Sequence, residues 1–243
     1  MKLNRVCVAA SLLLLLPSAV VAQGIPPGTV LPVMLSSTLD ARHDKPGKVV
    51  TGTVMQDVPL PDGGRIPKGA KLVGQIVSSR TASAALPSQL RLKFDEVEYK
   101  GRRVPISAHL RAVASTLEVY EAWLPTNAID DYGTSPSDWN TVQIGGAGVF
   151  RGSGKLVYDD EIIGSATDYG AVTAKLVAAP RRGCTGESDS GQALWTFSPW
   201  ACGSYGLDGL KIVDPGKSDG EIELQSKTDV HVRGGSGWLL RVN

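Results

Sequence analysis

The sequence predicts a mainly β fold, a small β-barrel or a barrel-like sandwich, that carries a long insert. Two observations support this prediction. Apolar and polar residues alternate with a period of two in several short segments, and turn-forming Gly and Pro separate these segments. The chain also has 28 Gly and 15 Pro but few aromatic residues, a composition that suits many short strands joined by turns. No sustained helical periodicity competes with this interpretation.

The N-terminal segment has the features of a cleavable secretory signal peptide. A short basic region precedes an apolar run over residues 6–16, and Val20 and Ala22 occupy the −3 and −1 positions of a signal-peptidase site. We therefore expect residues 1–22 to be removed and the protein to be exported, to the periplasm or the cell exterior. An uncleaved N-terminal anchor is the alternative. No later stretch approaches the roughly 18 apolar residues of a spanning helix, so no transmembrane segment is expected after cleavage.

The charge balance argues against two classes of partner. The chain has 25 Lys and Arg against 24 Asp and Glu, and it stays nearly neutral when Lys2 and Arg5 leave with the signal peptide. It contains no long basic block. Nucleic acid and anionic lipid are therefore not expected as partners.

The first half of the mature chain predicts strands in a regular order. Residues 29–35, 48–54 and 70–77 are rich in β-branched and apolar residues, and turn signals separate them. Pro32 suggests that the first strand lies at an edge or that Pro32 is among that strand's first residues. We expect a hairpin over residues 89–114.

Alternation is clearest in that hairpin. Leu90, Leu92 and Phe94 share one face, opposite Arg91, Lys93 and Asp95. After Gly101 the pattern continues, and it places His109 and Arg111 on the polar face. The hairpin is therefore predicted to have one dry face and one wet face.

Short alternating segments at 221–224, 230–232 and 238–242 predict that strands also close the chain. Between the two sets, residues 116–220 change in character and form the predicted insert. The predicted organisation is thus a barrel from residues 23–115 and 221–243, interrupted by the insert.

Several of these pieces occur together in one family. They are Gly-Thr-Val-Leu-Pro-Val at 28–33, Lys-Pro-Gly at 45–47, Ile-Pro-Lys-Gly-Ala-Lys-Leu-Val-Gly at 66–74, Gly-Arg-Arg-Val-Pro-Ile at 101–106 and Val-His-Val-Arg-Gly-Gly-Ser at 230–236. In this order and spacing they resemble the β-barrel domain of TrbI-type conjugal-transfer proteins, the channel scaffold components of type IV secretion systems. The resemblance covers about half of the mature chain and implies a barrel and a scaffold role.

The chain also departs from that family. It has no long proline-rich stalk before the barrel, and its insert contains no apolar helix long enough to line a pore. Pore formation is therefore not carried over. The chain resembles a stand-alone exported relative of the barrel with an unrelated insert.

Cys184 and Cys202 both lie in the insert. In an oxidising compartment such a pair predicts a disulfide, which would close a loop of about 18 residues. A zinc site is the rival interpretation, but the segment between them has no His, and two thiolates rarely suffice.

No residue pattern predicts catalysis or a cofactor. His43 lies in a polar loop, and His109 and His231 lie at wet-face positions of predicted strands. The glycine-rich run 145–155 lacks the spacing of a phosphate-binding loop and predicts a loop or hairpin tip. The acidic run 159–161, with Asp168 nearby, could bind calcium, but acidic turns are common and its spacing fits no EF-hand loop.

Aromatic residues gather around the predicted disulfide: Trp195, Phe197, Trp200 and Tyr205. Exposed Trp195, Trp200 and Tyr205 would make a binding platform for a sugar or a protein partner. Alternatively, they pack over the disulfide as a small satellite core.

The sequence thus favours a non-enzymatic envelope protein that binds another envelope protein or a glycan. A carbohydrate-binding module that uses the aromatic residues is the alternative, and a secreted hydrolase is the third and least supported.

Overall fold

The computed structural model describes residues 24–122, 201–213 and 220–243. Within residues 123–200 it describes short strands and a few isolated positions, among them Ile144, Thr196 and Phe197. Every structural statement below refers to these residues.

A ten-stranded sheet forms the main body. Its strands, in spatial order, are β17 (Gly203–Tyr205), β9 (Ala108–Ala114), β21 (Gly237–Val242), β1 (Val30–Leu35), β3 (Val49–Val54), β6 (Lys71–Arg80), β7 (Ser88–Tyr99), β19 (Glu221–Ser226) and β18 (Leu210–Val213), with β8 (Arg102–Pro105) paired to β7. All of these neighbours are antiparallel except β17 and β9, which are parallel. The fold is mainly β, as predicted.

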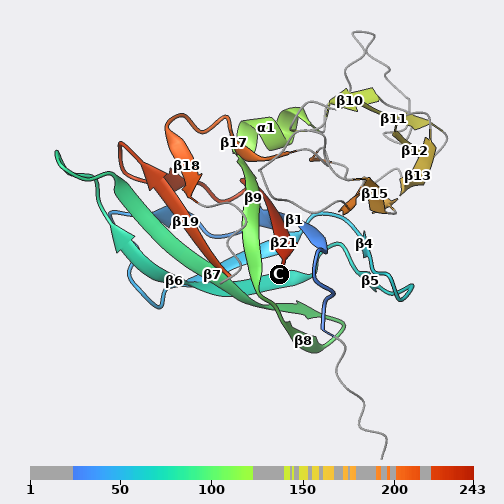
Figure 1. The fold of residues 1–243 in the computed structure, drawn as a ribbon, viewed down its shortest axis with the longest axis horizontal. Helices are drawn as coiled ribbons and strands as arrows, with labels where there is room; N and C mark the ends of the chain where they lie inside the picture. Colours follow the sequence, from blue (N-terminus) through green and yellow to red (C-terminus); the bar gives the residue numbers. More distant parts are fainter. Residues whose placement is uncertain are drawn as a thin grey trace, which may run out of the picture.

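The sheet curls until its two ends nearly meet. The end strands β17 and β18 lie side by side and follow each other in the chain, with only residues 206–209 between them. This short connection keeps the two outermost strands of the sheet next to each other. The sheet therefore has the nearly closed, barrel-like shape seen in Figure 1.

The remaining strands form smaller sheets. β2 (Leu39–Asp40) pairs with β20 (His231–Val232), and β4 (Val58–Pro59) pairs with β5 (Arg65–Ile66). A five-stranded sheet contains β10 (Asn140–Val142), β11 (Gly148–Gly152), β12 (Lys155–Tyr158), β13 (Glu161–Ala166) and β14 (Val172–Ala174), and β15 (Leu176–Ala178) pairs with β16 (Ser190–Gln192). Figure 1 shows β10 to β13 in yellow, and the short helix α1 (Thr116–Glu121) in green directly after β9.

Apolar side chains fill the inside of the barrel. Trp238 is fully buried and meets Phe94 edge to face, with ring centroids 6.3 Å apart. Its indole nitrogen donates to the Ser236 hydroxyl at 3.0 Å, so the one polar atom of the ring is satisfied. Leu90 and Leu92 point into the same core, as their alternation predicts.

Of the two positions predicted for Pro32, the structure shows the second. β1 is an internal strand, between β21 and β3, and Pro32 lies among its first residues. Proline is tolerated there because the pairing of β1 with β3 covers only Val33 to Leu35. At the end of this ladder the Pro32 carbonyl accepts a hydrogen bond from the Met55 backbone at 2.9 Å.

The predicted hairpin over 89–114 is only partly present. β7 and β8 pair across the turn at Lys100 and Gly101, but the chain then leaves β7, and β9 pairs with β21 instead. The prediction that His109 and Arg111 lie on a solvent-exposed face of the second strand, β9, is wrong, because both residues are buried.

A second apolar cluster explains this burial. It covers the outer side of β1, β9 and β21 and contains residues from α1 and from isolated insert positions: Val30, Met55, Ala112, Ala114, Val119, Ala122, Ile144, Phe197, Ala201 and Leu239. β9 and β21 are therefore buried on both faces, whereas Met34 of β1 stays exposed. His109 also pairs its Nδ1 with Asn243 Oδ1 at 2.6 Å.

Two further elements differ from the prediction. β17 and β18 lie within the range assigned to the insert, yet they belong to the main sheet. α1 is a helix that the sequence did not predict, because six residues are too few to show a helical period. No helix among the described residues is both long and apolar enough to span a membrane.

Candidate functional site: the capped end of the barrel

A two-stranded cap closes one end of the barrel. Leu39 and Val232 are fully buried, so β2 and β20 pack onto the barrel core. Side chains fix the cap to the β6–β7 hairpin: the Ser79 hydroxyl donates to the Ala41 carbonyl at 2.7 Å, and the Ala82 backbone donates to the Asp229 carboxylate at 2.8 Å. We call this end of the barrel the capped end.

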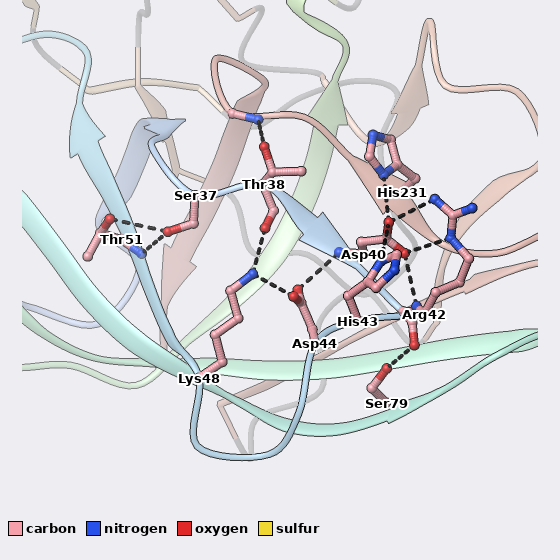
Figure 2. A network of polar contacts seen from close by, with 12 residues as sticks. Ser37, Thr38, Asp40, Arg42, His43, Asp44, Lys48, Thr51, Ser79 and His231 are labelled. Carbon is pink, nitrogen blue, oxygen red and sulfur yellow. Dashed lines mark hydrogen bonds and ion pairs between the residues drawn. The ribbon is translucent and has the colours of Figure 1, made fainter.

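Asp40 lies at the centre of a polar network in the cap, shown in Figure 2. Arg42 donates to both carboxylate oxygens, through Nε at 3.1 Å and Nη2 at 2.9 Å, and its backbone nitrogen donates at 2.9 Å. The Nδ1 atoms of His43 and His231 lie 3.1 and 3.5 Å from Asp40 Oδ2. One buried carboxylate thus orients three side chains that extend into solvent.

These contacts also set the charge of Asp40. Hydrogen bonds from Arg42 hold the pKa of the Asp40 carboxyl well below its usual range, against the opposing effect of burial. Asp40 is therefore an anion at any physiological pH.

A second ion pair stabilises the loop after β2. The Asp44 carboxylate accepts hydrogen bonds from the Asp40 backbone nitrogen at 3.0 Å and from Lys48 Nζ. Lys48 also donates to the Thr38 carbonyl at 3.0 Å. The two acidic residues therefore hold residues 38–48 in one conformation and fix the positions of Arg42 and His43.

The two histidines lie on opposite sides of the Asp40 carboxylate, as Figure 2 shows. The part of the chain that the structure describes contains no group of three or more His, Cys, Asp or Glu side chains that could hold a metal ion. Arg42 and both histidines keep exposed nitrogen atoms, which can form hydrogen bonds with solvent.

An open groove lies at the same end. It has a volume of about 400 Å³ and runs between the loop that joins β6 to β7, residues 83–87, and the β18–β19 pair. Gly209, Lys211 and residues 225–227 form its other wall. Residues 227–231 lead directly from this wall into the cap.

The residues predicted to bind a ligand are only partly described. Tyr205 is half-buried, packs against the second apolar cluster and accepts a hydrogen bond from the Cys202 backbone at 3.1 Å. Phe197 is fully buried in that cluster. Trp195 and Trp200 lie outside the described residues, so a platform that contains them stays a prediction.

Two further predictions fall outside the described residues in whole or in part. Cys202 is disulfide-bonded, but Cys184 lies outside, so their pairing stays a prediction. The same holds for the calcium alternative, since the structure describes no side chain of the acidic run 159–161 or of Asp168. In the glycine-rich run, β11 and β12 are adjacent antiparallel strands, as a hairpin requires.

The residues of the cap network around Asp40 belong to a segment, 36–47, that its polar composition predicts to be a loop. Its one signal is the density of charge in Asp40-Ala-Arg42-His43-Asp44. The contribution of His231 could not be found this way, because His231 lies 191 positions after Asp40 and only strand pairing brings the two together.

The chain matches no family model and no curated protein in the comparisons made. The class that the structure itself defines is therefore a barrel-like β protein with a solid core and a polar capped end.

Proposed function

We propose that this protein is a non-enzymatic binding or scaffold module of the cell envelope, and that the capped end is its binding surface. One observation carries the proposal. Apolar side chains fill the barrel interior, whereas fixed, exposed donors and an open groove lie together at the capped end. A partner would then bind on the outside of the barrel, where the network around Asp40 preorganises the surface.

The resemblance to TrbI-type barrels supports the scaffold part of this proposal. The most specific motif, residues 66–69, is built into the fold: Ile66 is buried, and Gly69 has φ +87° and donates to the Val54 carbonyl at 2.9 Å. Only glycine takes up such a backbone conformation without strain. The shared residues therefore build a barrel, and scaffolding is what that family does with it.

Chemical crosslinking in the organism that encodes the chain tests the proposal. An epitope-tagged copy would be crosslinked in living cells, purified and analysed by mass spectrometry, with a tagged unrelated exported protein as the control. We expect one or a few envelope components to be enriched with this chain alone. N-terminal sequencing of the same sample should begin at Gln23. Turnover of a substrate by the purified chain, with no enriched component, would overturn the proposal.

A further inference from the structure

The groove at the capped end has two chemically different walls. One wall is the 83–87 loop, which presents Leu86 with half of its surface exposed, next to Pro87. The other wall presents the ammonium groups of Lys211 and Lys227, both on exposed residues. No carboxylate is among the described groups that line the groove.

The apolar wall is held in place by its own hydrogen bonds. The Ser83 backbone donates to the Leu86 carbonyl at 2.9 Å, and the Leu86 backbone donates to the Ser83 hydroxyl at 3.1 Å. Arg80 Nη2 donates to the Pro87 carbonyl at 3.2 Å, which ties the end of the loop to β6. A loop fixed in this way loses little conformational entropy when a ligand binds.

The strand pair β18–β19 fixes the backbone of the wall that carries the two lysines. Lys211 lies on β18 opposite Gln225 of β19, in a regular antiparallel pair. Lys227 follows β19 directly, before the chain enters the cap. Asp208 is exposed beside Gly209, and it is the nearest carboxylate in sequence to this wall.

We infer that the groove binds an acidic peptide segment of a partner protein, with carboxylate side chains on Lys211 and Lys227 and an apolar side chain against Leu86. The inference rests on the proposed function and names the class of partner. Charge complementarity carries it, because two lysines, with no carboxylate among the described residues of the lining, favour an anionic ligand. The volume of about 400 Å³ holds a few residues and not a folded domain.

Fluorescence anisotropy with synthetic probes tests this directly. The probe is a fluorescein-labelled pentapeptide in which Glu and Leu alternate, titrated with the predicted mature chain, residues 23–243. We expect saturable binding that weakens as the NaCl concentration rises, since exposed ion pairs are screened. The same peptide with Lys in place of Glu should not bind.

Charge-reversal variants locate the site. The double variant Lys211→Glu/Lys227→Glu should bind the acidic probe at least about tenfold more weakly. The matched control Lys100→Glu/Lys155→Glu makes the same change in net charge at exposed lysines away from the groove, and it should bind within about twofold of the parent. Asp208→Asn should bind more tightly, which gives a gain that misfolding cannot produce.

Equal loss in both double variants, equal binding of the basic probe, or no saturable binding would overturn the inference. The proposed function has a separate outcome. If crosslinking in cells enriches a partner and the acidic probe does not bind, the capped end is a binding surface for ligands of another kind, and only the acidic-peptide inference fails.

Discussion

Gly74 occupies the point where β6 and β7 approach most closely. A Cβ built on Gly74 would lie 2.0 Å from the Lys93 carbonyl oxygen and 2.7 Å from the Phe94 Cα. The register between the two strands shifts at this position, which indicates a bulge that brings the backbones together. Backbone atoms cannot move aside as a flexible side chain can, so only glycine fits.

The substitution Gly74→Ala should therefore destabilise the protein by about 3 kcal/mol, at the upper end of the cost of overpacking a core. Urea unfolding followed by tryptophan fluorescence measures the change. Gly24→Ala is the control, because nothing lies within 4 Å of its Cβ position. A loss below about 0.5 kcal/mol at Gly74 would show that the strands can separate without cost.

Asp40 is the residue on which the cap network depends. Asp40→Asn removes the charge that Arg42 and two histidines share, and we expect it to lower the free energy of unfolding by about 2 kcal/mol at pH 7, a usual value for hydrogen bonds to a charged group. Asp62→Asn, in an exposed turn, is the control and should change stability little.

The effect of Asp40 also has a defined pH dependence. Its pKa is lower in the folded state than in the unfolded chain, so its contribution is complete above about pH 4 and is lost as the pH falls toward the folded pKa. The difference between the parent and Asp40→Asn should narrow as the pH falls below about pH 4, where Asp40 becomes protonated in the unfolded chain first. A difference that does not narrow between pH 4 and pH 2 would contradict this assignment.

At the scale of single elements, α1 and Phe197 form a cover over β9 and β21. Val119 of α1 and Phe197 both lie against Gly237 of β21, where an added Cβ would meet them at 2.7 and 3.0 Å. The Ser115 hydroxyl caps α1 by accepting from the Glu118 backbone at 3.3 Å. This cover makes β9 and β21 dry on both faces.

Phe197→Ala should therefore cost about 3 kcal/mol, because it leaves a cavity in a closely packed cluster. Leu117→Ala, on the exposed side of α1, should cost less than about 0.5 kcal/mol. Thermal unfolding of both variants measures the difference. If the two substitutions lower stability equally, the buried contacts of Phe197 contribute no more to stability than an exposed side chain of α1.

The alternation of apolar and polar residues predicted correctly which side chains face the barrel core, but not which side chains on the outer face of the sheet are buried. Leu90, Leu92 and Phe94 point into the core because alternation specifies one face of any half-buried strand. His109 and Arg111 look equally regular in sequence, but both are buried, on a strand whose outer side is covered by residues distant in sequence. The segment 230–232 was predicted as a strand and contains β20, but β2 has only two residues and shows no period, so the pairing that forms the cap could not be predicted.

At the scale of the whole molecule, the fold places the proposed surface at one end of a solid barrel. The β6–β7 hairpin carries the groove loop at its capped end and β8 at its other end, as Figure 1 and the strand pairing show. Barrel closure also brings residues 39–44, 83–87 and 227–231 together from three distant parts of the sequence. The fold class was predictable from composition and alternation, whereas this juxtaposition follows only from the pairing of distant strands.

Site-specific photo-crosslinking in the encoding organism tests the central claim, that partners bind at the capped end, most directly. A photoreactive amino acid would replace His43 or Leu86 at the capped end, or Arg102 on β8 at the opposite end, all of them exposed positions. We predict crosslinks to an envelope component from His43 and Leu86 and few from Arg102. Crosslinks mainly from Arg102, or none from any position, would contradict the claim.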